Sequence, residues 1–359
     1  MPRIHPGLIR RTHATSPLVA RLLPICRDLR SSYRELTWLR DHAQHICRNA
    51  PLQNANRLLQ SYVLRRSRGE PLQYILGTEY FGPLEIQCRP GVLIPRQETA
   101  ASVTHLVNLL SSAGKTLPPR LRVLDLCTGT GCIPLLFQHE YYFRHKGQND
   151  SFPRLDVVGV DNSSVALRLA EKNKRLQLAA LRWSSSSTST KHQSLKAMTF
   201  MYADVLRGEE TLQLGTFDIL ISNPPYISST DYWRNTSPSV RKFEPHEALV
   251  PPANANGSLN DAHDGDLFYH HLHDIALRVN AQIVLLEVAD LEQAHRVSRA
   301  LNGPWDGVEI WRDEPAARDE NENTVCSSHL GSASIPILGL GNGRSVFAYR
   351  GRGAAWLGK

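Results

Sequence analysis

The sequence predicts an α/β fold: a mostly parallel seven-stranded sheet with helices on both faces, preceded by a small N-terminal helical domain. From residue 97 onward, short apolar runs typical of strands alternate with stretches of helical periodicity. Alternation of this kind implies parallel strands covered by helices. No helix of comparable length separates the last two strands, so one of them is expected to run antiparallel at the end of the sheet. The predicted strands are residues 121–126, 157–160, 198–202, 217–222, 282–288, 308–312 and 345–349.

The remaining segments follow from composition and periodicity. Residues 16–70 repeat apolar side chains at intervals of three and four, which predicts the helical domain. Residues 71–96 are rich in Gly, Pro and aromatic residues and predict a hairpin or linker to the sheet domain, residues 97–359. Three polar stretches, 138–153, 182–196 and 313–343, are expected to be surface insertions.

Composition excludes several classes of protein. The 359 residues are 41% hydrophobic and 21% charged, a balance that excludes a mainly disordered or collagen-like chain. The longest apolar runs fall far below the ~18–20 residues that a membrane-spanning helix needs, so no membrane insertion is expected. The formal charge of +7 (41 basic minus 34 acidic residues) permits an anionic partner without establishing one.

Cysteine and histidine spacing predicts no metal site. The six cysteines lie far apart and show no zinc-pair spacing, so reduced thiols are expected. His263, His270, His271 and His273 lack a helical His-Glu-x-x-His pattern and are expected on a solvated helix face.

The N-terminus has two interpretations. Residues 1–15 contain Arg3, Arg10 and Arg11, and no acidic residue precedes Asp28, which fits a mitochondrial targeting segment. Alternatively, the apolar residues from Leu18 onward begin the first helix of the folded domain.

Two segments predict a nucleotide-like ligand at the carboxyl end of the sheet. A strand leads into the glycine-rich turn Cys127-Thr-Gly-Thr-Gly131, and glycine is required where backbone approaches a ligand or takes positive φ. Asp161 ends the next strand, where its carboxylate would accept both hydroxyls of a ribose. The alternative for Asp161 is a cap for the helix that follows it.

The most informative segment is Asn223-Pro-Pro-Tyr226, directly after a predicted buried strand. The two prolines fix the backbone and have no N–H to donate. The turn therefore presents two acceptors, the Asn223 side-chain oxygen and the Pro224 carbonyl, which suit a planar –NH2 group. The alternative is a rigid turn without chemistry.

These motifs resemble the class I S-adenosylmethionine-dependent methyltransferases, and within them the HemK-type family that methylates a glutamine side-chain amide in peptide chain release factors. The resemblance is carried by residues 69–77, 90–99 and 243–249 together with the glycine loop, Asp161 and the Asn223–Tyr226 string. It implies a Rossmann-like methyltransferase domain over residues 97–359 and a substrate-recognition role for the helical domain. It also implies a protein that acts on a release factor, with no stable nucleic-acid binding. A monomer is expected, and the composition of the N-terminus predicts that it acts in the mitochondrion.

The resemblance implies a role for each motif residue. Cys127, Thr128, Gly129, Thr130 and Gly131 would line the methionine part of S-adenosylmethionine, Asp161 would hold its ribose, Asp204 and Val205 would flank its adenine, and Asn223 would adjoin the cofactor. The catalytic residues would be Asn223, Pro224, Pro225 and Tyr226, which would bind the glutamine amide of the Gly-Gly-Gln motif.

Three departures and two rival functions remain. Cys127 stands where the family usually has glycine, Val205 where it often has an aromatic residue, and residues 251–257 are longer and more polar than the family's turn.

An adenine amino-methyltransferase on DNA or RNA faces the same –NH2 geometry and would require a base-flipping pocket. A methyltransferase-like scaffold that binds a partner without catalysis is the third possibility.

Overall fold

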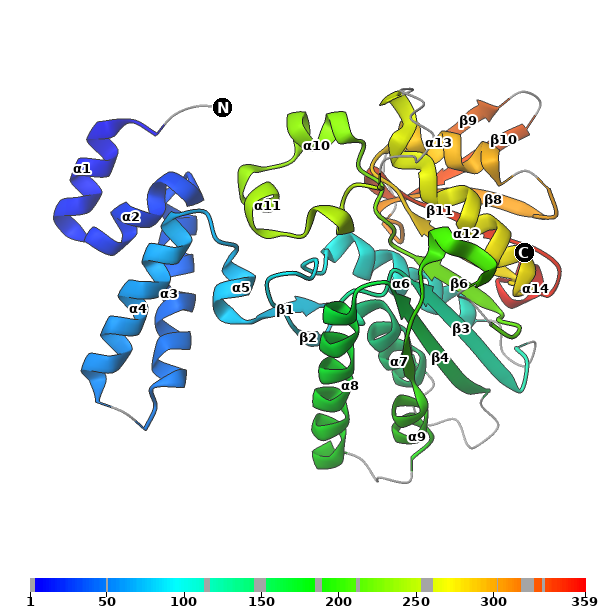
Figure 1. Ribbon diagram of the computed structural model, residues 1–359, viewed down its shortest axis with the longest axis horizontal. Helices are drawn as coiled ribbons and strands as arrows, with labels where there is room; N and C mark the ends of the chain where they lie inside the picture. The colour runs from blue at the N-terminus through cyan, green and yellow to red at the C-terminus, as the bar shows by residue number, and fades with distance from the viewer. Residues whose placement is uncertain are drawn as a thin grey trace. The chain divides into compact units, whose positions relative to one another are not determined.

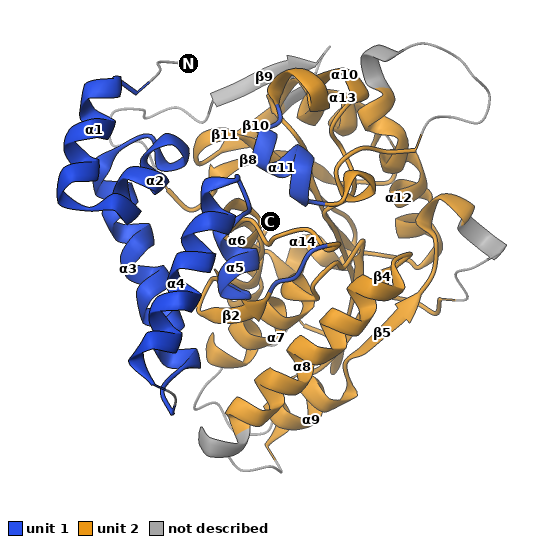
Figure 2. Cartoon of the chain, turned by 60° about the vertical axis from the view of Figure 1, so that its left-hand side comes forward, with its two compact units in different colours: residues 1–78, 88–90, 236–244 blue, residues 79–87, 91–235, 245–359 orange. Residues whose placement is uncertain are grey.

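The computed structural model describes residues 4–49, 51–112, 117–144, 153–184, 189–210, 214–252, 261–301, 303–317, 326–330 and 333–359. It divides into two compact units (Figure 2): residues 1–78, 88–90 and 236–244 form the first, and residues 79–87, 91–235 and 245–359 form the second. Among the described residues, no helix combines the length and the apolar character needed to cross a bilayer.

The first unit is helical. It contains α1 (Pro6–Thr15), α2 (Pro17–Cys26), α3 (Leu29–Ile46), α4 (Leu52–Ser67), α5 (Leu72–Leu76) and α11 (Pro238–Phe243). Its core contains Leu22, Leu39 and Val63, which the three- and four-residue spacing brings to one side of each helix. Arg66 pairs with Glu35 at 2.6 Å and joins α4 to α3.

The second unit is built on a nine-stranded sheet in the order β5-β4-β3-β6-β7-β11-β8-β10-β9 (Figure 1). Its strands are β3 (Arg120–Leu126), β4 (Arg154–Asp161), β5 (Thr199–Tyr202), β6 (Ile219–Ser222), β7 (Ile283–Glu287), β8 (Gly307–Glu314), β9 (Cys326–Leu330), β10 (Ala333–Leu338) and β11 (Leu340–Tyr349).

The seven strands predicted from the sequence are confirmed, and two more are added. β9 and β10 fall in the stretch 313–343, so the expectation of a surface insertion there was wrong. Ile335 and Ile337 of β10 alternate inward onto the core, which is the period of a half-buried strand. β11 runs antiparallel as expected, but it lies between β7 and β8 rather than at the end of the sheet.

Helices cover both faces of the sheet (Figure 1). The helical elements of the second unit are α6 (Gln97–Ser111), α7 (Cys132–Arg144), α8 (Ser164–Ser184), α9 (Thr190–Ala197), η2 (Val205–Glu210), α10 (Ser229–Asn235), η3 (His246–Ala248), η4 (Asp261–Asp266), α12 (Leu267–Arg278), α13 (Leu291–Ala300) and α14 (Arg352–Trp356).

Alternate strand residues separate two cores. Val123 and Ile221 pack with α6 and α7 on one face, whereas Leu124 and Leu220 pack with α12 and α13 on the other. The described parts of the stretches 138–153 and 182–196 belong to this packing, because Tyr141 of α7 and Leu195 of α9 are buried. The expectation of surface insertions therefore fails for these parts as well.

The hairpin of β1 (Thr78–Phe81) and β2 (Leu84–Gln87) packs into the second unit. Phe81 and Ile86 are fully buried in the same core as α6 and α7. The core of the sheet domain therefore includes side chains from before residue 97.

Two glycines in the turn from β3 into α7 have a positive φ, and at one of them a side chain would also meet neighbouring atoms. Gly131 has φ 75°, and a Cβ added there would lie 2.9 Å from Ala170 Cβ and 3.0 Å from Phe200 Cζ. Gly129 has φ 55°, but a Cβ at that position would meet no atom within 4 Å.

We expect Gly131→Ala to lower the free energy of unfolding more than Gly129→Ala, measured by denaturant titration. Both variants force an alanine into a left-handed conformation, at a cost of about 1–2 kcal/mol. Only Gly131→Ala also overpacks the space beside α8, which adds about 1–3 kcal/mol. Equal losses in the two variants would contradict the close approach of this turn to α8.

Candidate functional site

The carboxyl ends of four adjacent parallel strands are level in the sheet. Leu126 of β3 pairs with Val160 of β4 on one side and with Ser222 of β6 on the other. Ser222 in turn pairs with Leu286 of β7. The residues that follow these partners are Cys127, Asp161, Asn223 and Glu287. Parallel register therefore brings four polar side chains from distant parts of the sequence to one edge of the sheet.

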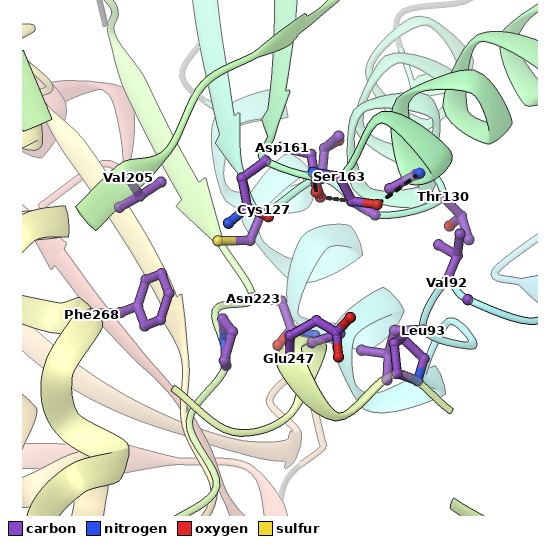
Figure 3. Close-up of a pocket in the computed structure, with 18 of the residues that line it drawn as sticks. Val92, Leu93, Cys127, Thr130, Asp161, Ser163, Val205, Asn223, Glu247 and Phe268 are labelled. Atoms are coloured by element: carbon purple, nitrogen blue, oxygen red, sulfur yellow. Dashed lines mark hydrogen bonds between the residues drawn. The ribbon is translucent and has the colours of Figure 1, made fainter. Parts of the chain in front are cut away.

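A cavity of about 800 Å³ opens at this edge (Figure 3). Its volume lies within the usual range for a small-molecule site. The residues predicted for the site that line it are Cys127, Thr128, Gly129, Thr130, Asp161, Asp204, Val205, Asn223 and Pro225. Gly131, Pro224 and Tyr226 were also predicted for the site but are not among the lining residues.

Asp161 joins the end of β4 to the glycine loop. Its Oδ2 accepts a hydrogen bond from Gly129 N at 2.8 Å, and its Oδ1 accepts one from Ser163 N at 2.8 Å. Ser163 Oγ accepts from Ala166 N at 3.3 Å, so a serine, rather than Asp161, bonds the first turn of α8. Burial raises the pKa of Asp161, and the backbone N–H groups of Gly129 and Ser163 oppose that rise.

The glycine loop carries buried polar atoms on the cavity wall. Thr128 Oγ1 and Thr130 Oγ1 are buried, and they lie beside the side chains of Asp125 and Cys132. Cys127 has φ 64°, a left-handed conformation that glycine adopts more readily than other residues. Burial raises the pKa of the Cys127 thiol well above its ordinary value.

One end of the cavity is apolar. Val205 follows Asp204 after β5, and Phe268 at the start of α12 lies near it on the same side (Figure 3). Both side chains are buried and belong to the same core. Asp204 Oδ1 accepts a hydrogen bond from Leu206 N at 3.0 Å, which holds the turn at this end. Phe268 thus supplies an aromatic surface beside Val205.

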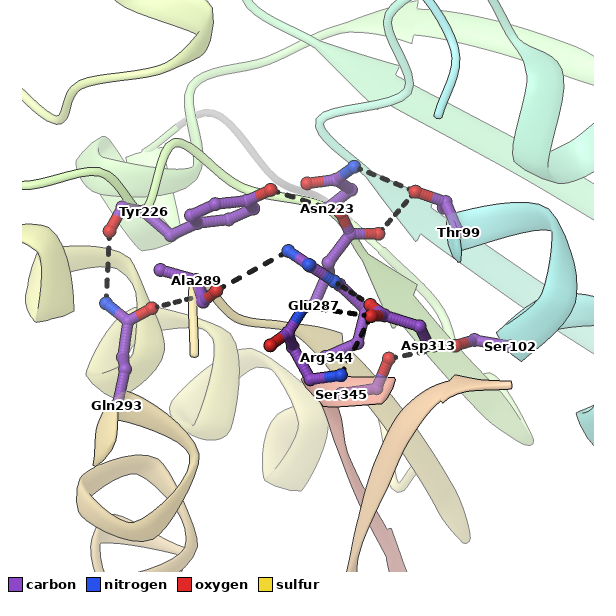
Figure 4. A network of polar contacts seen from close by, with 11 residues as sticks. Thr99, Ser102, Asn223, Tyr226, Glu287, Ala289, Gln293, Asp313, Arg344 and Ser345 are labelled. Carbon is purple, nitrogen blue, oxygen red and sulfur yellow. Dashed lines mark hydrogen bonds and ion pairs between the residues drawn. The ribbon is translucent and has the colours of Figure 1, made fainter. Parts of the chain in front are cut away.

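The Asn223–Tyr226 turn is held by a polar network (Figure 4), of which Asn223 and Thr99 also line the cavity. Asn223 Nδ2 donates to Thr99 Oγ1 at 3.4 Å, and Thr99 Oγ1 donates to Glu287 Oε2 at 2.5 Å. The hydroxyl of Tyr226 donates to Glu287 Oε1 at 3.2 Å. Tyr226 is therefore anchored at Glu287 rather than exposed in the cavity. Burial raises the pKa of Tyr226, and the neighbouring Glu287 raises it further.

Sequence reasoning missed three residues of this region. Glu287 ends an otherwise apolar strand, and a carboxylate in that position is a readable signal. Thr99 belongs to the segment 90–99, which carries part of the family resemblance, but nothing in that segment indicates a contact with Asn223. Phe268 follows a long connection, and no sequence signal indicated that it lines the cavity.

No cluster of three or more His, Cys, Asp or Glu side chains suited to a metal occurs in the described ranges. Within the histidine group, His273 Nε2 accepts a hydrogen bond from Trp305 Nε1 at 3.3 Å. The side chain of His263 lies outside the described residues.

The chain is similar in sequence to proteins of assigned activity. A sequence model described as N-6 DNA Methylase matches residues 99–259. The probable MRF1 mitochondrial N(5)-glutamine methyltransferase mtq1 of Schizosaccharomyces pombe is 32% identical over 71% of this chain and 75% of the relative. The mitochondrial MRF1 N(5)-glutamine methyltransferase MTQ1 of Saccharomyces cerevisiae is 33% identical over 70% of this chain and 68% of the relative.

A bacterial relative and a solved structure also match. The release factor glutamine methyltransferase of Thermodesulfovibrio yellowstonii is 29% identical over 71% of this chain and 76% of the relative. The hMettl16 catalytic domain in complex with MAT2A 3'UTR hairpin 6 matches with a TM-score of 0.41 and 15% identity, over 80% of this chain and 81% of that chain. With identities of 32% and 33% over more than two thirds of two relatives, the chain belongs to the release factor glutamine methyltransferase family.

Proposed function

We propose that the protein methylates the side-chain amide nitrogen of the glutamine in the Gly-Gly-Gln motif of a peptide chain release factor, with S-adenosylmethionine as the methyl donor. The observation that carries this proposal is Asn223 on the cavity wall at the carboxyl end of β6, followed by two prolines. Family membership supports the same reaction, because the relatives are named for it.

The cavity has the polarity that S-adenosylmethionine requires. Asp161 supplies a partly buried carboxylate for the ribose hydroxyls, at the point where β4 meets the glycine loop. Val205 and Phe268 offer apolar surface for the adenine ring. When bound, the cofactor supplies an electrophilic methyl group. Its fit to these residues supports its use here.

The chain's own residues would orient the amide and stabilise the charge that develops on its nitrogen. Asn223 Oδ1, on the cavity wall, would accept one amide hydrogen, and this bond strengthens as the nitrogen becomes positive. The Pro224 carbonyl is the proposed acceptor of the second hydrogen, although Pro224 is not among the residues that line the cavity. Pro224 and Pro225 add no competing N–H donor. No strong base is required, because a proton is acidic once the nitrogen is cationic. Most of the acceleration would come from positioning.

The helical unit is proposed to recognise the folded release factor. A protein partner needs on the order of 800 Å² of contact per side, more than a small-molecule cavity offers. On α3, Arg30, Arg34 and Trp38 are spaced by four residues, so they share one face, and all three are exposed. Trp38 is 46% exposed, and tryptophan and arginine are the residues most enriched in the centres of interfaces.

We propose that the protein acts in the mitochondrion as a monomer. The two fungal relatives are named as mitochondrial enzymes. α1 carries Arg10 and Arg11 and has no acidic residue, which fits the composition of a mitochondrial targeting helix.

Methylation of the adenine amino group in a nucleic acid is the second candidate, because the N-6 DNA Methylase match includes the Asn223–Tyr226 segment. The geometry required at the –NH2 group is the same. The relatives with a printed activity favour the glutamine substrate instead. We therefore propose no stable complex with nucleic acid.

Asn223→Ala should reduce kcat on the release factor by about 10²–10³-fold, the usual effect of removing one preorganised polar contact in a transition state. S-adenosylmethionine affinity should change far less than kcat, because the contact acts on the charge that develops during transfer. Asn235→Ala is the control, since Asn235 is exposed at the end of α10 and does not line the cavity. A near-native rate for Asn223→Ala would refute the amide-clamp mechanism.

Asp161→Ala should weaken S-adenosylmethionine binding by about 1.5–3 kcal/mol, the scale of hydrogen bonds to a charged group. Titration calorimetry measures the change. Asp156→Ala is the matched control, because Asp156 lies on the same strand, pairs with Arg120 and Arg154, and does not line the cavity. Unchanged affinity in a folded Asp161→Ala protein would remove Asp161 from the site.

Trp38→Ala should raise KM for the intact release factor by about 30-fold or more, which corresponds to the ~2 kcal/mol or more of an interface hot spot. The rate on a short Gly-Gly-Gln peptide should stay the same, because such a peptide reaches only the cavity. Steady-state assays on both substrates test this. An unchanged KM for the intact protein would show that this face of α3 does not bind the substrate.

A further inference from the structure

Glu287 is a buried carboxylate at the end of β7, in contact with three elements that border the cavity. It is 4% exposed, and its two oxygens accept hydrogen bonds from Thr99 of α6 and from Tyr226 of the turn after β6. Its backbone carbonyl accepts from the hydroxyl of Tyr269 at 2.9 Å. Figure 4 shows the hydroxyl of Thr99 joined by dashed lines to both Asn223 and Glu287.

A buried carboxylate costs stability, so its partners matter. Burial raises the pKa of Glu287, whereas the hydroxyl of Thr99, the cation of Arg344 on β11 and the hydroxyl of Tyr226 favour the ionised form, and Glu98 of α6 opposes it. An apolar side chain at the end of a buried strand would avoid the desolvation penalty altogether. The fold alone therefore gives no reason for a carboxylate here.

The hydroxyl of Thr99 has one hydrogen, and the carboxylate determines where it goes. Thr99 Oγ1 donates this hydrogen to Glu287 Oε2, the direction that an ionised carboxylate requires because it only accepts hydrogen bonds. The lone pairs of Thr99 Oγ1 then remain for Asn223, which meets them with Nδ2 at 3.4 Å. If the Thr99 hydroxyl donated to Asn223 instead of Glu287, it would bond Asn223 Oδ1. The Asn223 amide would then be flipped, with Nδ2 toward the substrate.

We propose that Glu287 and Thr99 are positioning residues that fix the amide of Asn223 with its oxygen toward the substrate. The inference rests on the proposed glutamine methylation and names what orients the acceptor of that reaction. Without this chain of donors, either end of the Asn223 amide would face the cavity. A nitrogen facing the cavity would repel the –NH2 group that it has to hold.

The same carboxylate holds the far end of the turn. Tyr226 donates to Glu287 through its hydroxyl, and its backbone carbonyl accepts from Gln293 Nε2 at 3.1 Å. Asn223 and Tyr226 are thus tied to one group, directly or through Thr99. The two prolines between them keep the spacing rigid.

The experiment compares kcat and KM for full-length Thr99→Val and Thr99→Ser with the native protein, using release factor and S-adenosylmethionine. Valine keeps the shape of threonine and removes the hydroxyl, whereas serine keeps the hydroxyl. We expect Thr99→Val to lose about 10- to 100-fold in kcat, the usual effect of a lost orienting partner. KM for both substrates should stay within about twofold, a size that corresponds to less than one ordinary hydrogen bond. Thr99→Ser should recover most of the rate.

Ser102→Ala is the matched control. Ser102 lies one turn further along α6, and its buried hydroxyl bonds Ser345 Oγ at 3.1 Å without reaching Asn223. Its kcat should equal the native value. If Thr99→Val does not fold, Thr99→Ala replaces it, and thermal melting confirms that each variant assayed is folded.

The outcomes separate this inference from the function on which it rests. If the native protein methylates release factor and a folded Thr99→Val protein keeps its kcat, the positioning role is wrong and the proposed function stands. The role is equally wrong if Thr99→Ser loses as much activity as Thr99→Val. If the native protein transfers no methyl group to release factor, the proposed function fails first.

Discussion

The whole site depends on the parallel register of β3, β4, β6 and β7. Because Leu126, Val160, Ser222 and Leu286 lie level in the sheet, the next residue of each strand emerges at the same edge. After β3 the next residue begins the glycine loop. After the other three strands the next residues are the carboxylate of Asp161, the amide of Asn223 and the carboxylate of Glu287. A slip of one residue in any strand would turn its polar residue to the other face. The buried apolar runs that fix the register therefore also fix the chemistry.

Register also explains why the polar groups at this edge are so strongly coupled. Asp161 holds Gly129 of the neighbouring turn, and Glu287 holds Thr99 and Tyr226. Each carboxylate is desolvated. Each also accepts hydrogen bonds from groups of the glycine loop, of α6 or of the Asn223–Tyr226 turn. In a low-dielectric setting such bonds resist reorientation, so the donors and acceptors are in place before a substrate arrives. Desolvation of the two carboxylates lowers the stability of the fold, and the rigid site is what the fold gains in return.

The strands could be predicted from apolar runs, and they are confirmed. The position of Asp161 and Asn223 at the cavity could also be predicted, because polar residues that end neighbouring parallel strands gather at one edge of the sheet. Their roles stay predictions. The contact between Thr99 and Asn223 spans 124 positions and arises from the packing of α6 on the sheet, which no local pattern encodes. Phe268 lines the cavity for the same reason. β9 and β10 were missed because their surroundings are polar and the alternation of Ile335 and Ile337 is short.

The most direct test of the account is to locate the transferred methyl group. The native protein is incubated with isotopically labelled S-adenosylmethionine and an equal mixture of release factor and adenine-containing RNA, and both products are digested for mass spectrometry. The account predicts label on the side-chain nitrogen of the glutamine in the Gly-Gly-Gln tryptic peptide and none on adenine. Label on adenine with an unmodified release factor would contradict it.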